Sequence, residues 1–506
     1  MSFIHSTSKK SAIVLSYIAI ILNTLTAVFL TPFLLRKLGV DGYGLYQMIY
    51  SVGNYILILN LGIATVMIRY ISEFRAKGDK RGEQNFAAMI GLFVIAVVIL
   101  AVTVGLIVNT NLEGIFKNLS VSDYDKSHQM LIIIIVQIGL TIIDHYYTGI
   151  IGAYERFSYL RIVNILQIVS VFVFTILFVN LGMGAVGIVL ANAMMTLIKL
   201  LVDAYYSHFV LKFKIYFYYW NSTIVAPVMG LSMAIFLQSI VGNVNSSLDK
   251  TILGIMLTKK DVAMYSVAAS IITMFNTIPG VFSGLFQPQV TRMIVKNATE
   301  KSLTDLVIKV GRWQFIVTGA MFFGFVLFGL DFMKLWVGEE MKGALWIMLI
   351  IMPFNMIPLI QTVCLSILNA YDKRIFRSLI LVAMTVVNIF ITILLIKHIG
   401  IWGAPIGTAF SYLIGHVIIM NIYYSRYIHL NVRRMFKGIF NRIFIVLLST
   451  SLLCLPLLLW TDINFISFGI KVVIFLIVYG SLLMVWGFNK EEKEIVNALL
   501  LKVKIR

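Results

Sequence analysis

The chain has 506 residues, of which 60% are hydrophobic and only 12% are charged. This composition predicts an all-α, polytopic membrane protein and excludes an ordinary soluble multidomain protein. The net charge of +19 does not indicate nucleic-acid binding, because the basic residues lie in short segments between long apolar runs, where membrane topology favours them. We therefore expect the lipid bilayer, and no nucleic acid, among the partners.

The sequence also argues against a cofactor or a metal site. Cys364 and Cys454 both lie inside apolar runs, so we expect neither a disulfide framework nor a cysteine-based metal site. No phosphate-binding loop, metalloprotease motif or nucleophile elbow is present, and the seven histidines do not cluster. We expect a protein that needs no cofactor and is not an enzyme.

The first two spans form a predicted hairpin. An apolar run over 12–35 is followed by a glycine-rich corner over 36–44 and by a second run over 46–70. Each run is long enough to cross roughly 30 Å of hydrocarbon as a helix. The first run is too long for a signal-peptide core and has no cleavage site near its end, so we expect it to stay as an uncleaved helix.

Twelve further apolar runs follow. The fourteen predicted spans lie near 12–35, 46–70, 86–108, 128–150, 161–181, 184–206, 230–257, 262–286, 306–330, 343–366, 376–397, 402–424, 443–461 and 466–488. An even number places both termini on one side. On that side lie about 30 of the basic residues, which predicts that both termini are cytoplasmic.

An internal repeat divides the spans into two sets of six. The segment 152–156 resembles 369–373, and Tyr205-Tyr206 recurs as Tyr423-Tyr424, at a separation of about 218 residues. Parallel repeats of this kind are related by an axis along the membrane normal. We expect an N-terminal lobe (1–210), a cytoplasmic interfacial linker (211–229), a C-terminal lobe (230–428), two additional helices (429–488) and a cytoplasmic tail (489–506).

Ionisable residues inside spans cost about 2.5–3.5 kcal/mol each on insertion scales, so they are candidate functional positions. Asp144 and His145 are neighbours in the fourth span. A carboxylate beside an imidazole can carry a proton during alternating access, and it can equally bond to a neighbouring helix. Asp144, His145 and Asp249 are the candidates for ion coupling. Arg69, at the end of the second span, is a candidate for holding a lipid phosphate, with extension to the interface as the alternative.

The seventh span carries a polar stripe. Gln238, Gly242, Asn245 and Asp249 are spaced as i, i+4, i+7 and i+11, and Ser239, Asn243, Ser246 and Lys250 repeat this spacing one residue later. Such a stripe does not face lipid; it faces a central cavity or, alternatively, packs against other helices. The predicted substrate-cavity residues are Asn23, Arg69, Gln238, Asn243, Asn245, Asp249 and Lys250.

Several short motifs carry a family resemblance by their order and spacing. They are Arg36-Lys37-Leu38-Gly39, Tyr43-Gly44-Leu45-Tyr46, Asn60-Leu61-Gly62-Ile63, Arg69-Tyr70-Ile71-Ser72-Glu73, Leu248-Asp249-Lys250 and Asn369-Ala370. With these motifs the chain resembles Wzx-type polysaccharide flippases of the multidrug/oligosaccharidyl-lipid/polysaccharide exporter superfamily, over roughly residues 10–430.

The resemblance implies a function. A protein of this kind moves an undecaprenyl-pyrophosphate-linked oligosaccharide from the cytoplasmic to the outer leaflet of the bacterial plasma membrane, for O-antigen or capsule synthesis. It also implies alternating access of two lobes, coupling to H⁺ or Na⁺, and a polysaccharide polymerase as a partner. The alternatives are a multidrug or small-molecule antiporter of the same fold and a membrane enzyme of polysaccharide assembly. The first span has no acidic residue and no outer loop is large, which disfavours both.

Overall fold

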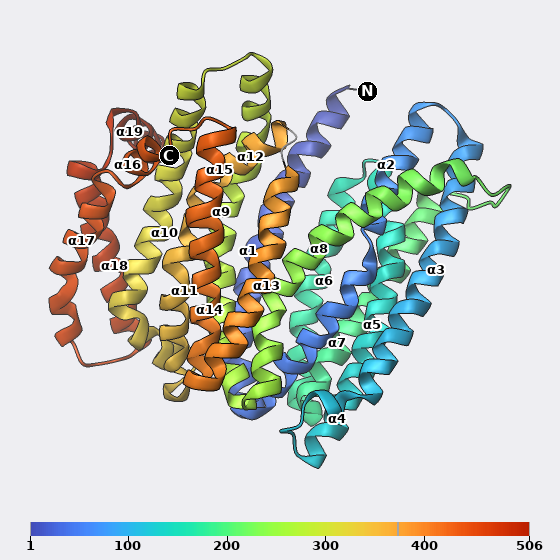
Figure 1. Ribbon diagram of the computed structural model, residues 1–506, viewed down its shortest axis with the longest axis horizontal. Helices are drawn as coiled ribbons and strands as arrows, with labels where there is room; N and C mark the ends of the chain where they lie inside the picture. Colours follow the sequence, from blue (N-terminus) through green and yellow to red (C-terminus); the bar gives the residue numbers. More distant parts are fainter. Residues whose placement is uncertain (1, 372–373, 505–506) are drawn as a thin grey trace. The chain divides into compact units, whose positions relative to one another are not determined.

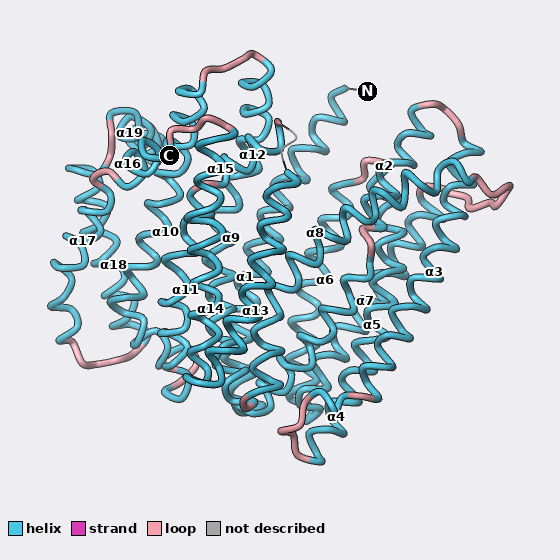
Figure 2. The backbone as a smooth tube through the Cα atoms, in the orientation of Figure 1, coloured by secondary structure: helices cyan, strands magenta, loops and turns pink. Residues whose placement is uncertain are grey.

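The computed structural model describes residues 2–371 and 374–504. Every regular element in this part of the chain is a helix, and Figure 2 shows helices joined by short loops, with no strand among the described residues. The predicted all-α class is therefore confirmed. Backbone contacts divide the chain into two compact units, Met1–Ser266 and Val267–Arg506. The division falls inside one helix, and the lobe boundaries given above stay a prediction.

The first unit contains the N-terminal helices. They are α1 (Ser2–Leu57), α2 (Ile63–Ala76), α3 (Lys80–Thr110), α4 (Leu112–Ile115), α5 (Val121–Ala153), α6 (Phe157–Phe178), α7 (Gly184–Tyr205), α8 (Ser222–Met256) and the start of α9 (Lys259–Val295). Helix α5 has many buried apolar side chains, and it packs against α2, α3 and α7. Figure 1 shows α3, α5 and α7 as neighbouring, nearly parallel helices.

The second unit contains the remaining helices. They are α10 (Glu300–Trp336), α11 (Gly343–Ile360), α12 (Thr362–Ala370), α13 (Arg374–Ile399), α14 (Gly403–Tyr412), α15 (Met420–Tyr427), α16 (Val432–Phe440), α17 (Ile443–Cys454), α18 (Phe465–Leu482) and α19 (Lys490–Lys504). Helix α10 packs against α11, α16, α17 and α18, so it is the structural centre of this unit. Cys364 and Cys454 are both buried and free.

Helix α1 is broken where the hairpin was predicted. At Gly39 the backbone leaves the helical conformation, with φ 71° and ψ 172°, a combination that glycine adopts without strain. A straight helix of 56 residues would be about 84 Å long, far more than one bilayer crossing needs. The break lets the chain reverse its direction, as the blue ribbon in Figure 1 shows.

Nine stretches of the described residues are long and apolar enough to span a membrane, so the protein is a multi-pass membrane protein. Three of them have 63, 54 and 52 residues, whereas one crossing takes about 20. These three contain Gly39, Gly182 and Gly400 with positive φ, where a long helix can end and a second crossing begin. Fourteen crossings therefore stay a prediction that agrees with these lengths.

The segment after α7 is fixed to α3 by one asparagine. Oδ1 of Asn85 accepts hydrogen bonds from the backbone amides of Tyr218 and Tyr219, at 2.7 and 3.0 Å. Nδ2 of Asn85 donates to the carbonyl of Tyr219 at 2.9 Å. Asn85 is buried, so these three bonds satisfy both ends of an amide that would otherwise be costly to bury.

Candidate functional site

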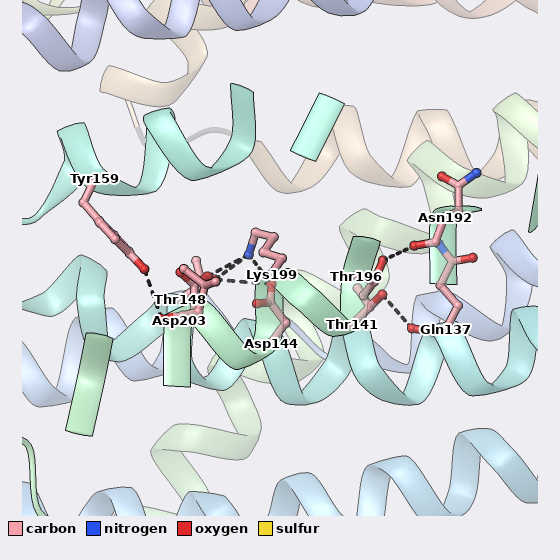
Figure 3. Close-up of polar contacts among 10 residues, drawn as sticks. Gln137, Thr141, Asp144, Thr148, Tyr159, Asn192, Thr196, Lys199 and Asp203 are labelled. Carbon is pink, nitrogen blue, oxygen red and sulfur yellow. Dashed lines mark hydrogen bonds and ion pairs between the residues drawn. The ribbon is translucent and has the colours of Figure 1, made fainter. Parts of the chain in front are cut away.

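Two polar clusters of the first unit contain residues that the sequence singles out, and the first of them joins α5 to α7. Asp144 and Thr148 are one turn apart on α5, and Lys199 and Asp203 are one turn apart on α7, so each pair faces the other helix. We call these four residues the acid–amine cluster (Figure 3). Nζ of Lys199 lies 2.9 Å from Oδ2 of Asp203 and also forms an ion pair with Asp144.

Thr148 completes the acid–amine cluster. Its Oγ1 lies 3.5 Å from Oδ2 of both Asp144 and Asp203, and 3.4 Å from Nζ of Lys199. Tyr159 on α6 lies beside the cluster and donates to the carbonyl of Val202 at 3.2 Å. The four residues of the acid–amine cluster thus lie between α5 and α7, with α6 beside them.

The acid–amine cluster is buried and its formal charge is not balanced. Asp144 is 4% exposed and Asp203 is fully buried, and the Lys199 side chain is 13% exposed. Two carboxylates and one ammonium give a net charge of −1 when all three are ionised. Oδ1 of Asp144 and Oδ1 of Asp203 are both buried and without a hydrogen-bond partner. One proton would neutralise the cluster and use one of these atoms.

Sequence reasoning identified only part of the acid–amine cluster. It paired Asp144 with His145, but the structure pairs Asp144 with Lys199, which is 55 residues away. His145 has a buried Nδ1 without a hydrogen-bond partner. Lys199 and Asp203 were missed although both lie within the predicted sixth span or at its end. The available signal was their spacing of four residues, which places both on one helical face.

The second cluster joins the end of α1 to the end of α8. Gln47, Ser51 and Asn54 lie on one face of α1 and contact Lys250, Thr251 and Ser247 of α8; we call these six residues the α1–α8 seam. Lys250 Nζ donates to Gln47 Oε1 at 3.1 Å, the Ser51 and Thr251 hydroxyls are 2.8 Å apart, and Asn54 Nδ2 donates to Ser247 Oγ at 3.1 Å.

Lys250 is the only cation of the α1–α8 seam. Its ammonium is partly buried, bonds to the neutral amide of Gln47 and has no carboxylate partner among the described residues. The adjacent Asp249 has a different partner, because it accepts a hydrogen bond from the Tyr265 hydroxyl of α9. The seam therefore presents an amine that can pair with an anion without first breaking an ion pair.

The other predicted cavity residues lie apart from both clusters. Asn23 is exposed on the first half of α1, and Arg69 is exposed on α2 with its guanidinium 5.6 Å from the Tyr70 ring. The side chains of Gln238, Asn243 and Asn245 lie outside the described residues, so the N-terminal part of the polar stripe stays a prediction. Of the predicted residues, the α1–α8 seam contains only Lys250, with Asp249 beside it.

The second unit contains an apolar groove between α10 and α18. The groove has a volume of ≈ 510 Å³. It is lined by Ile316, Val317, Ala320, Met321, Gly324, Phe325, Phe328 and Phe332 of α10 and by Phe468, Val472, Phe475, Leu476 and Tyr479 of α18. The hydroxyl of Tyr479 is used internally, donating to the Ile316 carbonyl at 2.9 Å. The groove can therefore hold hydrocarbon.

Residues 8–288, which include both clusters of the first unit, match a family described as "Polysaccharide biosynthesis protein". The chain belongs to this family. A relative from Shigella flexneri named "Putative O-antigen transporter" is 24% identical over 433 residues, which are 79% of this chain and 94% of the relative. The "Probable low-salt glycan biosynthesis flippase Agl15" of Haloferax volcanii is 24% identical over 36% of this chain and 38% of its own length.

Solved structures show that this polysaccharide biosynthesis protein has a transporter fold. The lipid II flippase MurJ in an inward closed conformation aligns with a TM-score of 0.69 at 14% identity, covering 93% of this chain and 97% of MurJ. An inward-facing multidrug transporter of the MATE family aligns with a TM-score of 0.63 at 12% identity, covering 79% and 92%. Together with the family match and the Shigella flexneri relative, this fold confirms the resemblance to Wzx-type exporter proteins and the expectation of a non-enzyme.

Proposed function

We propose that this protein moves a lipid-linked oligosaccharide from the cytoplasmic to the outer leaflet of the bacterial plasma membrane. The observation that carries the proposal is the uncompensated ammonium of Lys250 among the neutral polar side chains of the α1–α8 seam. Amides and hydroxyls suit sugars, and an ammonium suits the pyrophosphate of an undecaprenyl carrier. The near full-length similarity to the Shigella flexneri relative supports the same substrate class.

The apolar groove between α10 and α18 supports an amphiphilic substrate. A polyprenyl chain is entirely hydrocarbon. It therefore needs an apolar surface to lie against while its headgroup is in an aqueous cavity. The groove offers thirteen lining residues with one hydrogen-bonding group among their side chains, the hydroxyl of Tyr479, which is already bonded. A drug antiporter would not need such a lipid-compatible surface, which is why we favour the flippase over the antiporter.

The acid–amine cluster supports coupling to protons. The cluster can exchange one proton between a state of charge −1 and a neutral state, and both carboxylates have a buried oxygen to receive it. We assign the exchanged proton to the pair of carboxylates as a unit, with the Lys199 ammonium between them. Asp249 is bonded to the Tyr265 hydroxyl and lies outside this arrangement of two carboxylates around one ammonium, so it is the weaker candidate, and the contacts give His145 no role in the cluster.

The test is the sidedness of lipid-linked oligosaccharide in cells that lack this protein. We expect accumulation on the cytoplasmic leaflet, reversal by the wild-type gene, and reversal by Lys250→Arg but not by Lys250→Met. Normal sidedness with unpolymerised units outside would contradict the proposal and point to a polymerase, which we otherwise expect as a partner. An unchanged glycan together with drug sensitivity would favour the antiporter.

A further inference from the structure

A second polar pocket lies at one end of the second unit, where α10, the junction of α16 with α17, and the start of α19 meet. The pocket has a volume of ≈ 430 Å³, and four basic residues line it: Arg312, Arg442, Lys490 and Lys493. No carboxylate lines it. A pocket with this charge calls for an anion, so the partners of each basic group decide what the pocket can bind.

Arg312 builds the pocket and is not free to bind a ligand. Its Nε and Nη2 donate to the two oxygens of Glu492 at 2.6 and 2.9 Å. Nη1 donates to the carbonyls of Gly438 and Asn441 at 3.0 and 3.2 Å, and Nη2 donates to that of Gly487 at 2.8 Å. A guanidinium has five N–H donors, so all five are used. Arg312 fixes three chain segments to α10.

The three other cations are not neutralised by the acids around them. Arg442, Lys490 and Lys493 form no ion pair among the described residues. Glu492 is used by Arg312, and Glu491 pairs with Lys309 at 2.8 Å. The remaining acid of this stretch, Glu494, does not line the pocket. Three positive charges therefore share one concave surface, where they repel each other until an anion enters.

The backbone at Arg442 is unusual for a residue with a long side chain. Asn441 and Arg442 form the two-residue junction between α16 and α17, and Arg442 has φ 61° and ψ −36°. A positive φ favours glycine, and a long side chain there is uncommon. If the junction between α16 and α17 had only to reverse the chain, glycine at this position would be more stable than arginine. Arg442 is one of six non-glycine residues with positive φ in the described part of the chain, so the conformation fixes the place of its side chain at the pocket wall, and the charges of the pocket decide what it can bind.

The pocket lies where the protein surface changes from apolar to charged. Phe444 and Ile445 follow it on α17, and Val485 and Trp486 precede Gly487; all four are exposed. Exposed apolar and aromatic side chains of a membrane protein lie against lipid, with tryptophan enriched at the headgroup level. The pocket is therefore at the depth of lipid phosphates, on the side that the Lys and Arg distribution predicts to be cytoplasmic.

We propose that this pocket binds the phosphate of an anionic membrane phospholipid, held between Arg442, Lys490 and Lys493. The ligand is a resident lipid of the surrounding leaflet and is separate from the oligosaccharide carrier. Basic pockets of this kind at the cytoplasmic ends of helices suit multiply charged headgroups. The proposal does not depend on transport, because it concerns a site on the second unit that has its own contacts and charges.

The test uses the full-length protein in detergent micelles and native mass spectrometry with added lipids. The probes are cardiolipin, phosphatidylglycerol and, as a neutral reference, phosphatidylcholine. The variant is R442Q/K490Q/K493Q. The matched control is R292Q/K296Q/K301Q, which removes the same charge from exposed residues at the junction of α9 and α10. We expect saturable binding of anionic lipid to wild type and control, at least tenfold weaker binding to the variant, and no preference for the neutral lipid.

Two further measurements complete the test. Arg442→Gly removes the cation and the backbone strain together, so we expect an unchanged or higher melting temperature with weaker lipid binding; this separates binding from folding. Equal affinity of the triple variant and its control would overturn the site. Displacement of the lipid by an equal concentration of inorganic pyrophosphate would overturn the lipid as the source of the phosphate, in favour of a soluble anion.

Discussion

The Nζ atom of Lys199 lies 2.9 Å from Oδ2 of Asp203, one helical turn along α7, and the same atom forms an ion pair with Asp144 of α5. One ammonium thus serves two buried carboxylates on two helices. Because the carboxylates would repel each other without it, Lys199 controls both the packing of α5 against α7 and the charge of the cluster. The first two predictions follow from this arrangement.

Lys199→Met should destabilise the protein strongly. The change leaves two buried carboxylates without a cation, which costs about 3–5 kcal/mol for a buried pair. We expect a clear fall in the melting temperature measured by size-exclusion chromatography of heated samples. The control is Lys77→Met, whose exposed partner Glu73 is 2.6 Å away; water screens such a pair, so its loss should barely change the melting temperature. A loss no larger than that of the control would contradict the assigned role.

Asp144→Asn should remove the dependence of transport on a proton gradient. The variant keeps Lys199 and Asp203 as a balanced pair, so the cluster is neutral at every working pH and has no proton to release. In proteoliposomes, wild-type flipping should increase when the gradient drives protons through the protein, and the variant should be indifferent to it. Asp305→Asn, which changes an exposed partner of Arg434, should behave as wild type. Continued response of Asp144→Asn to the gradient would exclude the cluster from coupling.

Asp249→Ala and Asp249→Asn should differ. Asp249 is 4% exposed and accepts a hydrogen bond from Tyr265. Alanine leaves a buried hydroxyl without its acceptor, at a cost of about 1–3 kcal/mol, whereas asparagine keeps an acceptor oxygen. We expect a lower melting temperature for the alanine variant alone. If both variants lose transport activity while their melting temperatures stay unchanged, Asp249 contacts the substrate or an ion in addition to Tyr265.

Gly324→Leu should block the apolar groove without harming the fold. A Cβ at Gly324 meets no atom within 4 Å, and Gly324 lines the groove. Leucine improves helix propensity by up to ~1 kcal/mol, so the melting temperature should stay or rise. Flipping should fall by roughly tenfold, equivalent to ~1.4 kcal/mol of lost binding. Gly469→Leu on α18 is the matched control, because its surroundings are also open and it does not line the groove.

Arg312→Lys should be damaging despite the retained charge. Lysine has three donors on one atom, so it cannot serve both oxygens of Glu492 and the carbonyls of Gly438, Asn441 and Gly487 together. The expected cost is about 3 kcal/mol, read as a lower melting temperature. Lys309→Gln, which removes an exposed partner of Glu491, should barely change the melting temperature, because water screens exposed pairs. Equal losses of melting temperature in the two variants would mean that the geometry of the Arg312 guanidinium contributes nothing beyond its positive charge.

Sequence reasoning predicted the all-α membrane fold, the hairpin at Gly39 and the family. These features depend on local composition, because an apolar run of sufficient length must span the bilayer wherever it lies in the chain. Less of the candidate site could be predicted from the sequence. Asp144-His145 and Asp249-Lys250 are neighbours in sequence, but adjacent residues on a helix point in different directions. Lys199, which satisfies Asp144, is 55 residues away, and no local pattern reports which helices pack together.

The hydrogen bonds of Asn85 to Tyr218 and Tyr219 impose an order on biosynthesis. The ribosome makes Asn85 more than 130 residues before its partners, which at roughly 5–20 residues per second is a delay on the order of 10 s. During this interval α3 carries an unpaired amide near one end, and α5, α6 and α7 are inserted. The bonds can form only after all of these helices have been made, so they cannot stabilise α3 until this helix set is complete.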